Sequence, residues 1–291
     1  MNTKIYDRIY NTTVILIVAV IVFLCLVPFL HIASVSLSSN SAILASKVTL
    51  LPVDIDLESY FSIIRDDSMI RSLLFTVEIT AIFVLLGMFM TICAAYPLTK
   101  KWLKGRNVFL FIFLFTMFFS GGIIPDYILM KNLKLINNMW VLILPGMISV
   151  FNLIVLKSFL SSIPDSLVES AYIDGANEIT ILVRIILPLS APVLATLSLF
   201  YAVSKWNSFQ DALFFISDSS LYPLQLKIYQ IIYLTQSTDI AVQEGAGITS
   251  NVLPESLKAA SVMFATIPIL FVYPWLQKYF IKGAIVGSIK G

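Results

Sequence analysis

The stretch SLVESAYIDGANEITILVRIILPLSAP, residues 166–192, decides how the rest of the chain is interpreted, because it is polar and punctuated where its neighbours are almost uniformly apolar. The chain has 291 residues, of which 58% are hydrophobic and only 12% are charged. Soluble domains are closer to half apolar and roughly a quarter charged. The composition therefore predicts an integral membrane protein that holds residues 166–192 against one face of a bilayer.

Several kinds of chemistry are disfavoured by simple counts. The only histidine, His31, rules out an HExxH zinc helix and most histidine-based catalytic sets. Cys25 and Cys93 lie in apolar runs, which favours buried thiols over a disulfide or a metal site. No GxxxxGK[ST] motif occurs, so ATP and Mg²⁺, if used, must be bound by another subunit. We therefore expect a protein that is not an enzyme, with no catalytic residue, bound cofactor or metal site. The net charge of +2 is too small to indicate a nucleic-acid partner.

Six apolar runs have the length that a transmembrane helix needs, about 20 residues. They lie at about residues 13–34, 71–98, 108–124, 140–159, 185–203 and 258–280. The first run is longer than the core of a signal peptide, so we expect it to be retained. Pro268 and Pro274 interrupt the last run, which membrane helices tolerate when neighbouring helices satisfy the freed carbonyls. The pattern predicts an all-α polytopic fold with a single transmembrane domain over residues 1–291.

Charge sets the expected orientation of these runs. Lys100, Lys101, Lys104 and Arg106 follow the second run, and such basic loops are usually cytoplasmic. The segment at about 164–188 then also lies inside, the loops at about 39–67 and 204–256 lie outside, and both termini are cytoplasmic. The third run is expected to end outside at Gly121, Gly122 and Pro125.

The polar stretch itself has the local signals of two short helices. Ser166 to Glu169 fits a capping box just after Pro164. Gly175 suits the left-handed residue that commonly ends a helix, and Asn177 can begin the next one, which leads into the fifth run. These signals predict two helices joined at a glycine on the cytoplasmic surface.

At this point the sequence resembles a known family. Glu169, Ala171, Asp174, Gly175 and Ala176, followed by Leu187 and Pro188, resemble the EAA loop of ABC importer permeases, and the whole chain looks like a sugar-importer permease of the MalG type. FSGGIIPDYILMKNLKLINNMW, residues 119–140, and LYPLQL, residues 221–226, are similar to the LplC and YtcP subfamily, which is associated with oligosaccharides released from polysaccharides. Ser170 departs from the motif, which usually has a second alanine there.

The resemblance implies a type I ABC importer fold and a set of partners. The EAA loop would form a coupling helix that docks on a separate ATP-binding subunit, with Glu169, Ala171, Asp174, Gly175, Ala176, Leu187 and Pro188 as the coupling residues. A homologous second permease, two ATP-binding subunits and an extracellular solute-binding lipoprotein would complete an importer in the bacterial cytoplasmic membrane. The cargo implied is an oligosaccharide.

Candidate residues for the substrate path are less sharply defined. Glu78 lies within the second run, where a charge is costly, so it either faces the path or sits near the outer interface and pairs with Arg71 or another subunit. Asn152, Trp206, Asn207 and Gln225 have the amides and the aromatic ring that suit a sugar, yet interfacial tryptophan and helix-joining asparagine are common in membrane proteins. In MalG-like permeases the outer loop before the last run contacts the solute-binding protein, which implies a docking role here for residues 206–255.

Three other functions compete with this interpretation. An importer permease for a non-sugar solute is one alternative. A stand-alone secondary transporter or channel should show inverted repeats with interrupted helices in matching positions, and we find none in the sequence. A membrane-embedded enzyme needs a nucleophile and a base. His31, the only histidine, lies near a helix end and is poorly suited to act as that base.

Overall fold

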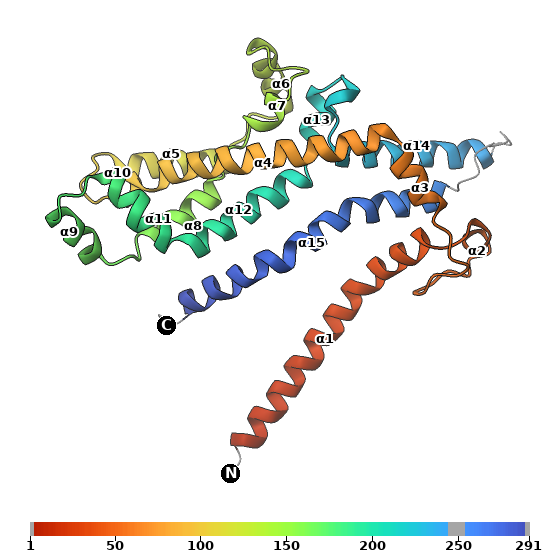
Figure 1. Ribbon diagram of the computed structural model, residues 1–291, viewed down its shortest axis with the longest axis horizontal. Coiled ribbons are helices and arrows are strands. Elements are labelled where there is room, and N and C mark those ends of the chain that lie inside the picture. Colours follow the sequence, from red (N-terminus) through yellow and green to blue (C-terminus); the bar gives the residue numbers. More distant parts are fainter. Residues whose placement is uncertain (1–2, 244–253, 289–291) are drawn as a thin grey trace. The chain divides into compact units, whose positions relative to one another are not determined.

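The computed structural model describes residues 3–243 and 254–288, and Figure 1 shows the course of the chain. Within this part the chain is built from helices and turns, with one isolated bridge between Ser38 and Ile55. The helices fall into two compact units, which we describe separately. The first unit is Met1–Ile70 with Ile228–Pro268, and the second is Arg71–Lys227 with Ile269–Gly291.

The first unit is dominated by one long apolar helix. It contains α1 (Thr3–Ser36), α2 (Asn40–Leu44), α3 (Glu58–Arg65), most of α14 (Leu224–Gln243) and the first half of α15 (Pro254–Ser288). Large apolar side chains along α1 are exposed, which suits contact with lipid tails. The Oγ of Ser59 donates to the Oγ of Ser256 at 2.9 Å, and that hydroxyl donates to the Oδ1 of Asn40 at 3.4 Å. This chain of hydrogen bonds joins α3, α15 and α2.

The second unit contains the remaining helices. They are α4 (Asp67–Ala95), η1 (Pro97–Thr99), α5 (Arg106–Phe118), α6 (Ile123–Asn132), α7 (Trp140–Ile143), α8 (Val150–Leu160), α9 (Asp165–Ile173), α10 (Glu178–Ile181), η2 (Leu182–Ile186), α11 (Leu187–Leu189), α12 (Ala191–Trp206), α13 (Gln210–Phe215) and η3 (Ser219–Leu221). The segment η2 is a π-helix, and η1 and η3 are 3₁₀ turns.

The core of the second unit follows from residues spaced three or four apart, which share one face of a helix. The buried side chains are Phe75, Ile79 and Phe83 of α4, Leu153, Leu156 and Leu160 of α8, and Val193, Leu197 and Tyr201 of α12. Helix α8 packs against both α5 and α12. Most phenylalanines of α5 are instead exposed, as their near-alternating spacing predicts for side chains that contact lipid.

The long helices agree with part of the predicted membrane topology. In the described residues, Tyr6–Ser36, Asp67–Thr99 and Pro254–Val272 are long and apolar enough to cross a bilayer. Three further pairs of helices are long and apolar enough to cross a bilayer when the two members are taken together, but each pair is bent. The bend is 113° between α5 and α6, 70° between α8 and α9, and 81° between Glu178–Leu189 and α12. The chain thus has three such helices, or up to six spans if each bent pair counts as one.

Three predicted boundaries require correction. Helix α5 ends at Phe118, before Gly121 and Gly122. Pro125 does not end a helix, since it lies in the first turn of α6. The run at 140–159 is not one helix, since it is interrupted after Ile143 and Gly146 has a φ of +78°. The run at 185–203 becomes α12 only from Ala191 and continues to Trp206.

The expectation of buried thiols was also wrong. Cys25 and Cys93 are both free and exposed in the isolated chain. Lipid is as apolar as a protein interior, so small side chains of a helix that faces lipid can stay exposed on the protein surface. Position in an apolar run therefore does not distinguish a lipid-facing thiol from a buried one.

Candidate functional site

The predicted coupling segment is a short helix, α9, with one face packed and one face free. Val168 packs against the core of the second unit, and Ala171 is 6% exposed. Glu169 and Asp174 are exposed, and so are Leu167 and Ile173, the latter at 86%. The free face of α9 therefore carries two carboxylates and large apolar side chains.

The start of α9 differs from the predicted capping box. The helix begins at Asp165 with Pro164 as its N-cap, and no side chain caps it. Ser166 therefore lies inside the first turn, where its carbonyl accepts a 2.9 Å hydrogen bond from the Oγ of Ser170. Asp165 places a carboxylate near the positive end of the helix dipole, which supports a helix start without a hydroxyl cap.

The end of α9 confirms the predicted glycine break. Gly175 has a φ of +80°, its N–H donates to the carbonyl of Tyr172 at 3.0 Å, and the N–H of Ala176 donates to the carbonyl of Ala171 at 2.9 Å. These two bonds form a Schellman motif. Asn177 then caps α10, since its Oδ1 accepts from the N–H of Thr180 at 2.8 Å.

Leu187 and Pro188 lie where the coupling segment turns into α12. The π-helix η2 comes directly before them, and Pro188 cannot donate a helical hydrogen bond, which is a common setting for a π-bulge or a kink. Leu187 is half-buried and Pro188 is exposed. The 81° bend after Leu189 sets the direction in which α12 leaves the coupling segment.

Glu178 holds the coupling segment to the end of α4. Its carboxylate accepts hydrogen bonds from the hydroxyls of Tyr172 and Tyr96, the latter at 2.5 Å, and lies 3.0 Å from the Nζ of Lys100. The Nζ of Lys100 also sits 4.7 Å from the centre of the Tyr96 ring, within the range of a cation–π contact. One side chain on α10 thus joins α9 to the residues that follow α4.

The charges of this cluster favour an ionised carboxylate. Burial acts to raise the pKa of Glu178, but the hydrogen bonds from Tyr172, Tyr96 and Lys100 and the charge of Lys100 outweigh it, so the pKa is lowered. The hydrogen bond to Glu178 in turn raises the pKa of the Tyr172 hydroxyl. At neutral pH Glu178 is therefore ionised and can accept these hydrogen bonds as a carboxylate.

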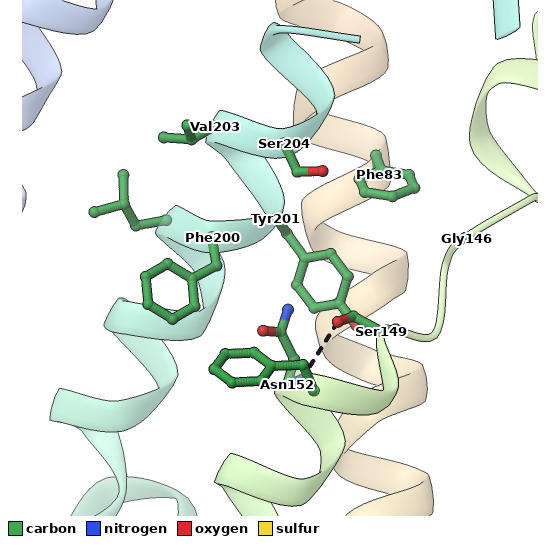
Figure 2. A pocket seen from close by; sticks show the side chains of 10 residues that line it. Phe83, Gly146, Ser149, Asn152, Phe200, Tyr201, Val203 and Ser204 are labelled. Carbon is green, nitrogen blue, oxygen red and sulfur yellow. Dashed lines mark hydrogen bonds between the residues drawn. The ribbon is translucent and has the colours of Figure 1, made fainter. Parts of the chain in front are cut away.

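A cavity of about 650 Å³ lies between α4, α8 and α12 (Figure 2). Asn152, one of the predicted path residues, lines it and is 4% exposed. The rings of Phe151 and Phe200 lie beside Asn152, with centres 6.2 Å apart, and the hydroxyls of Ser149 and Ser204 also face this space. Flat apolar rings beside an amide and hydroxyls suit a ligand that has both apolar faces and hydroxyl groups, such as a sugar.

Tyr201 fixes one wall of this cavity. Its hydroxyl lies 2.7 Å from the Oγ1 of Thr91 on α4 and accepts from the N–H of Ser149 at 2.9 Å. Gly87 allows the ring to approach, because a Cβ there would lie 3.1 Å from the Tyr201 ring and 3.2 Å from the carbonyl of Met147. Tyr201 therefore links α4, the start of α8 and α12.

The other predicted path residues do not join Asn152. Trp206, at the end of α12, is 8% exposed, so it is less accessible than an interfacial ring would be. The Nε2 of Gln225 donates to the Oδ1 of Asn207 at 3.5 Å, which brings these two amides together outside the cavity. Glu78 is exposed on α4, and among the ion pairs of the described residues none joins it to Arg71.

The site also contains residues that were not predicted from the sequence. Tyr201, Phe151 and Phe200 are aromatic residues in apolar runs, where nothing in the spacing distinguishes a cavity wall from lipid contact. Glu178 could have been identified from the sequence, because it is an acidic residue two positions after Ala176 in the predicted coupling segment. Lys205 is buried on α12 and lies 3.6 Å from Asp211, an ion pair that ties α12 to α13.

These elements define a polytopic helical transport subunit with an exposed coupling segment, and comparison with known proteins agrees. Residues 67–286 match the family described as binding-protein-dependent transport system inner membrane component, and the chain belongs to this family. It is therefore a multi-pass permease of the cytoplasmic membrane.

Named relatives match over nearly the whole chain. The polygalacturonan/rhamnogalacturonan transport system permease protein YtcP of Bacillus subtilis is 39% identical, over 98% of this chain and 99% of the relative. Protein LplC of the same organism is 40% identical, over 100% of this chain and 97% of the relative. A solved bacterial ABC transporter involved in the import of the acidic polysaccharide alginate contains a chain with a TM-score of 0.84 and 32% identity, covering 94% of this chain and 97% of that one.

Proposed function

We propose that this permease forms half of the translocation path of an ATP-driven importer for oligosaccharides derived from polysaccharides. The observation that carries the cargo class is the match, over nearly their full lengths, to a polygalacturonan/rhamnogalacturonan permease and to the alginate transporter. The cavity around Asn152 is chemically suited to such a cargo, because its aromatic rings can stack on sugar faces while the amide and hydroxyls bind sugar hydroxyls.

In the proposed importer, this chain pairs with a second permease and receives the sugar from a solute-binding lipoprotein outside the cell. One of the two ATP-binding subunits, which hold ATP and Mg²⁺, docks on α9, and the other docks on the second permease. Exposed Glu169 and Asp174 contact the subunit that docks on α9, the Gly175 break sets the angle of the helix, and Leu187 and Pro188 pass its movement to α12. Both termini of this chain lie in the cytoplasm.

Uptake by the reconstituted importer tests the assignment of the cavity. The full-length chain, purified with its accompanying subunits and placed in proteoliposomes, should accumulate labelled oligosaccharide only when ATP is present. Asn152→Ala should reduce uptake about 3-fold to 10-fold, the effect of one hydrogen bond to the passing sugar.

Asn107→Ala provides the matched control, since Asn107 is an exposed asparagine on α5 that does not line the cavity. Its uptake should equal that of the unmodified chain. Equal uptake by the two variants would reject the cavity as part of the path. Accumulation without ATP would reject the importer and support a secondary transporter.

A further inference from the structure

A second cavity, of about 510 Å³, lies where α4 and α8 end and α5 begins, beside α9. Its walls are unusually basic for a membrane permease with a net charge of only +2. Four cationic side chains line it, and they come from three separate segments of the chain: Lys100, Lys101, Arg106 and Lys157. Two acidic residues, Asp165 and Glu169, line it as well.

The ion pairs leave part of this positive charge unmatched. Lys100 lies 3.0 Å from Glu178, and Lys101 lies 3.4 Å from Asp165. Among the described residues, no acidic partner lies within ion-pair distance of Arg106 or Lys157. Glu169 also lines the cavity and has no ion-pair partner among the described residues, so Arg106 and Lys157 still leave a net positive charge, which favours a bound anion.

The position of the cavity corresponds to the headgroup level of a bilayer. The apolar span Asp67–Thr99 ends at its edge, and α5 begins there with Arg106. Trp102, which also lines the cavity, is 70% exposed, as is typical of tryptophan at a membrane interface. Directly after Arg106, Val108 and Phe109 are exposed at 61% and 51%, so an apolar surface continues from the basic site along α5.

We propose that this cavity binds the phosphate of an acidic phospholipid, with Arg106 and Lys157 as its principal ligands. The guanidinium of Arg106 can hold two phosphate oxygens at once, and Lys157 supplies a second charge from the end of α8. The acyl chains then lie along the exposed apolar side chains of α5, where a soluble phosphate would have nothing to contact. Basic pockets between the ends of membrane helices are known sites for lipid headgroups. This proposal concerns a site distinct from the sugar path and does not depend on the cargo.

Native mass spectrometry of the full-length chain, purified with its accompanying subunits and titrated with phosphatidylglycerol, tests the site. The unmodified protein should retain one lipid more tightly than the rest. Replacing both ligands, Arg106→Gln with Lys157→Gln, should weaken this binding about 30-fold, as expected for two lost cations near a membrane surface. Arg106→Lys with Lys157→Arg keeps both charges and should restore most of the affinity.

Lys104→Gln is the matched control, because Lys104 is an exposed lysine in the same basic loop that does not line the cavity. It should leave binding of the retained lipid unchanged. An equal loss in Lys104→Gln and in the double variant would overturn the proposal, since general surface charge would then explain it. Phosphatidylcholine or glycerol phosphate binding as tightly as phosphatidylglycerol would overturn it too.

Discussion

Among single residues, Glu178 joins α10 to two other segments: to α9 through Tyr172, and to the end of α4 through Tyr96 and Lys100. Hydrogen bonds to a charged group contribute about 1.5–3 kcal/mol each when buried, and the 38% exposure of the Glu178 side chain reduces this. We expect Glu178→Ala to destabilise the folded protein by about 1–2 kcal/mol and to lower uptake more than ATP hydrolysis, because α9 would move without α4. Thermal unfolding in detergent and the ratio of uptake to hydrolysis measure the two effects.

Lys101→Gln is the control for this prediction, because the pair of Lys101 with Asp165 is exposed on both sides and should contribute little. Acid should act on the unmodified protein in the same direction as the alanine variant. The pKa of Glu178 is lower in the folded protein than in an unfolded chain, so its contribution is complete at neutral pH and is lost as the pH falls through the lowered pKa. A ratio of uptake to hydrolysis that is the same in both variants would contradict the role of Glu178.

Single residues were predictable where backbone geometry depends on one residue type. Gly175 and Asn177 were identified because a left-handed φ and a side-chain cap each favour few residues. Ser166 was misassigned because two helix starts two residues apart, at Asp165 or Leu167, look alike in sequence. The ring of Tyr201 could not have been placed, since contact with lipid and contact with a cavity select the same apolar aromatic residues.

At the scale of elements, apolar length predicted the helices that run straight and failed where the chain bends inside an apolar run. The runs at 13–34 and 71–98 lie within single described spans. The run at 140–159 has the same composition, yet Pro145 and Gly146 separate α7 from α8. That interruption matters for function, because Gly146 and Ser149 then line the cavity that contains Asn152. In this run, Pro145 and Gly146 are therefore better evidence of the cavity than the hydropathy of the run is.

The junction of α9 and α10 offers a test of coupling. A Cβ on Gly175 would meet nothing within 4 Å, so the main cost of a substitution there comes from its backbone conformation. Gly175→Val should cost about 1–2 kcal/mol for a φ near +80° and should change the angle of α9. ATP hydrolysis should continue while sugar uptake falls, as measured in parallel in proteoliposomes.

Gly175→Asn is the matched variant, because asparagine adopts the left-handed conformation at a lower cost. It should keep most of the uptake that the valine variant loses. Normal uptake by Gly175→Val at unmodified abundance, or equal losses in both variants, would show that the Schellman motif does not set the coupling geometry.

At the scale of the whole molecule, the orientation of the chain in the bilayer decides whether α9 can meet an ATP-binding subunit at all. The basic loop with Lys104 and the coupling segment should share one face, and the loop that carries Ser219 should lie on the other. In a background with Cys25 and Cys93 replaced by alanine, we expect a membrane-impermeant maleimide to label Ser219→Cys in intact cells. Lys104→Cys should react only after permeabilisation. Both positions are exposed, so burial cannot explain a difference in labelling. Labelling of Lys104→Cys from outside would reverse the orientation and place α9 beyond the reach of any cytoplasmic ATPase, which would refute the coupling role whatever the cargo.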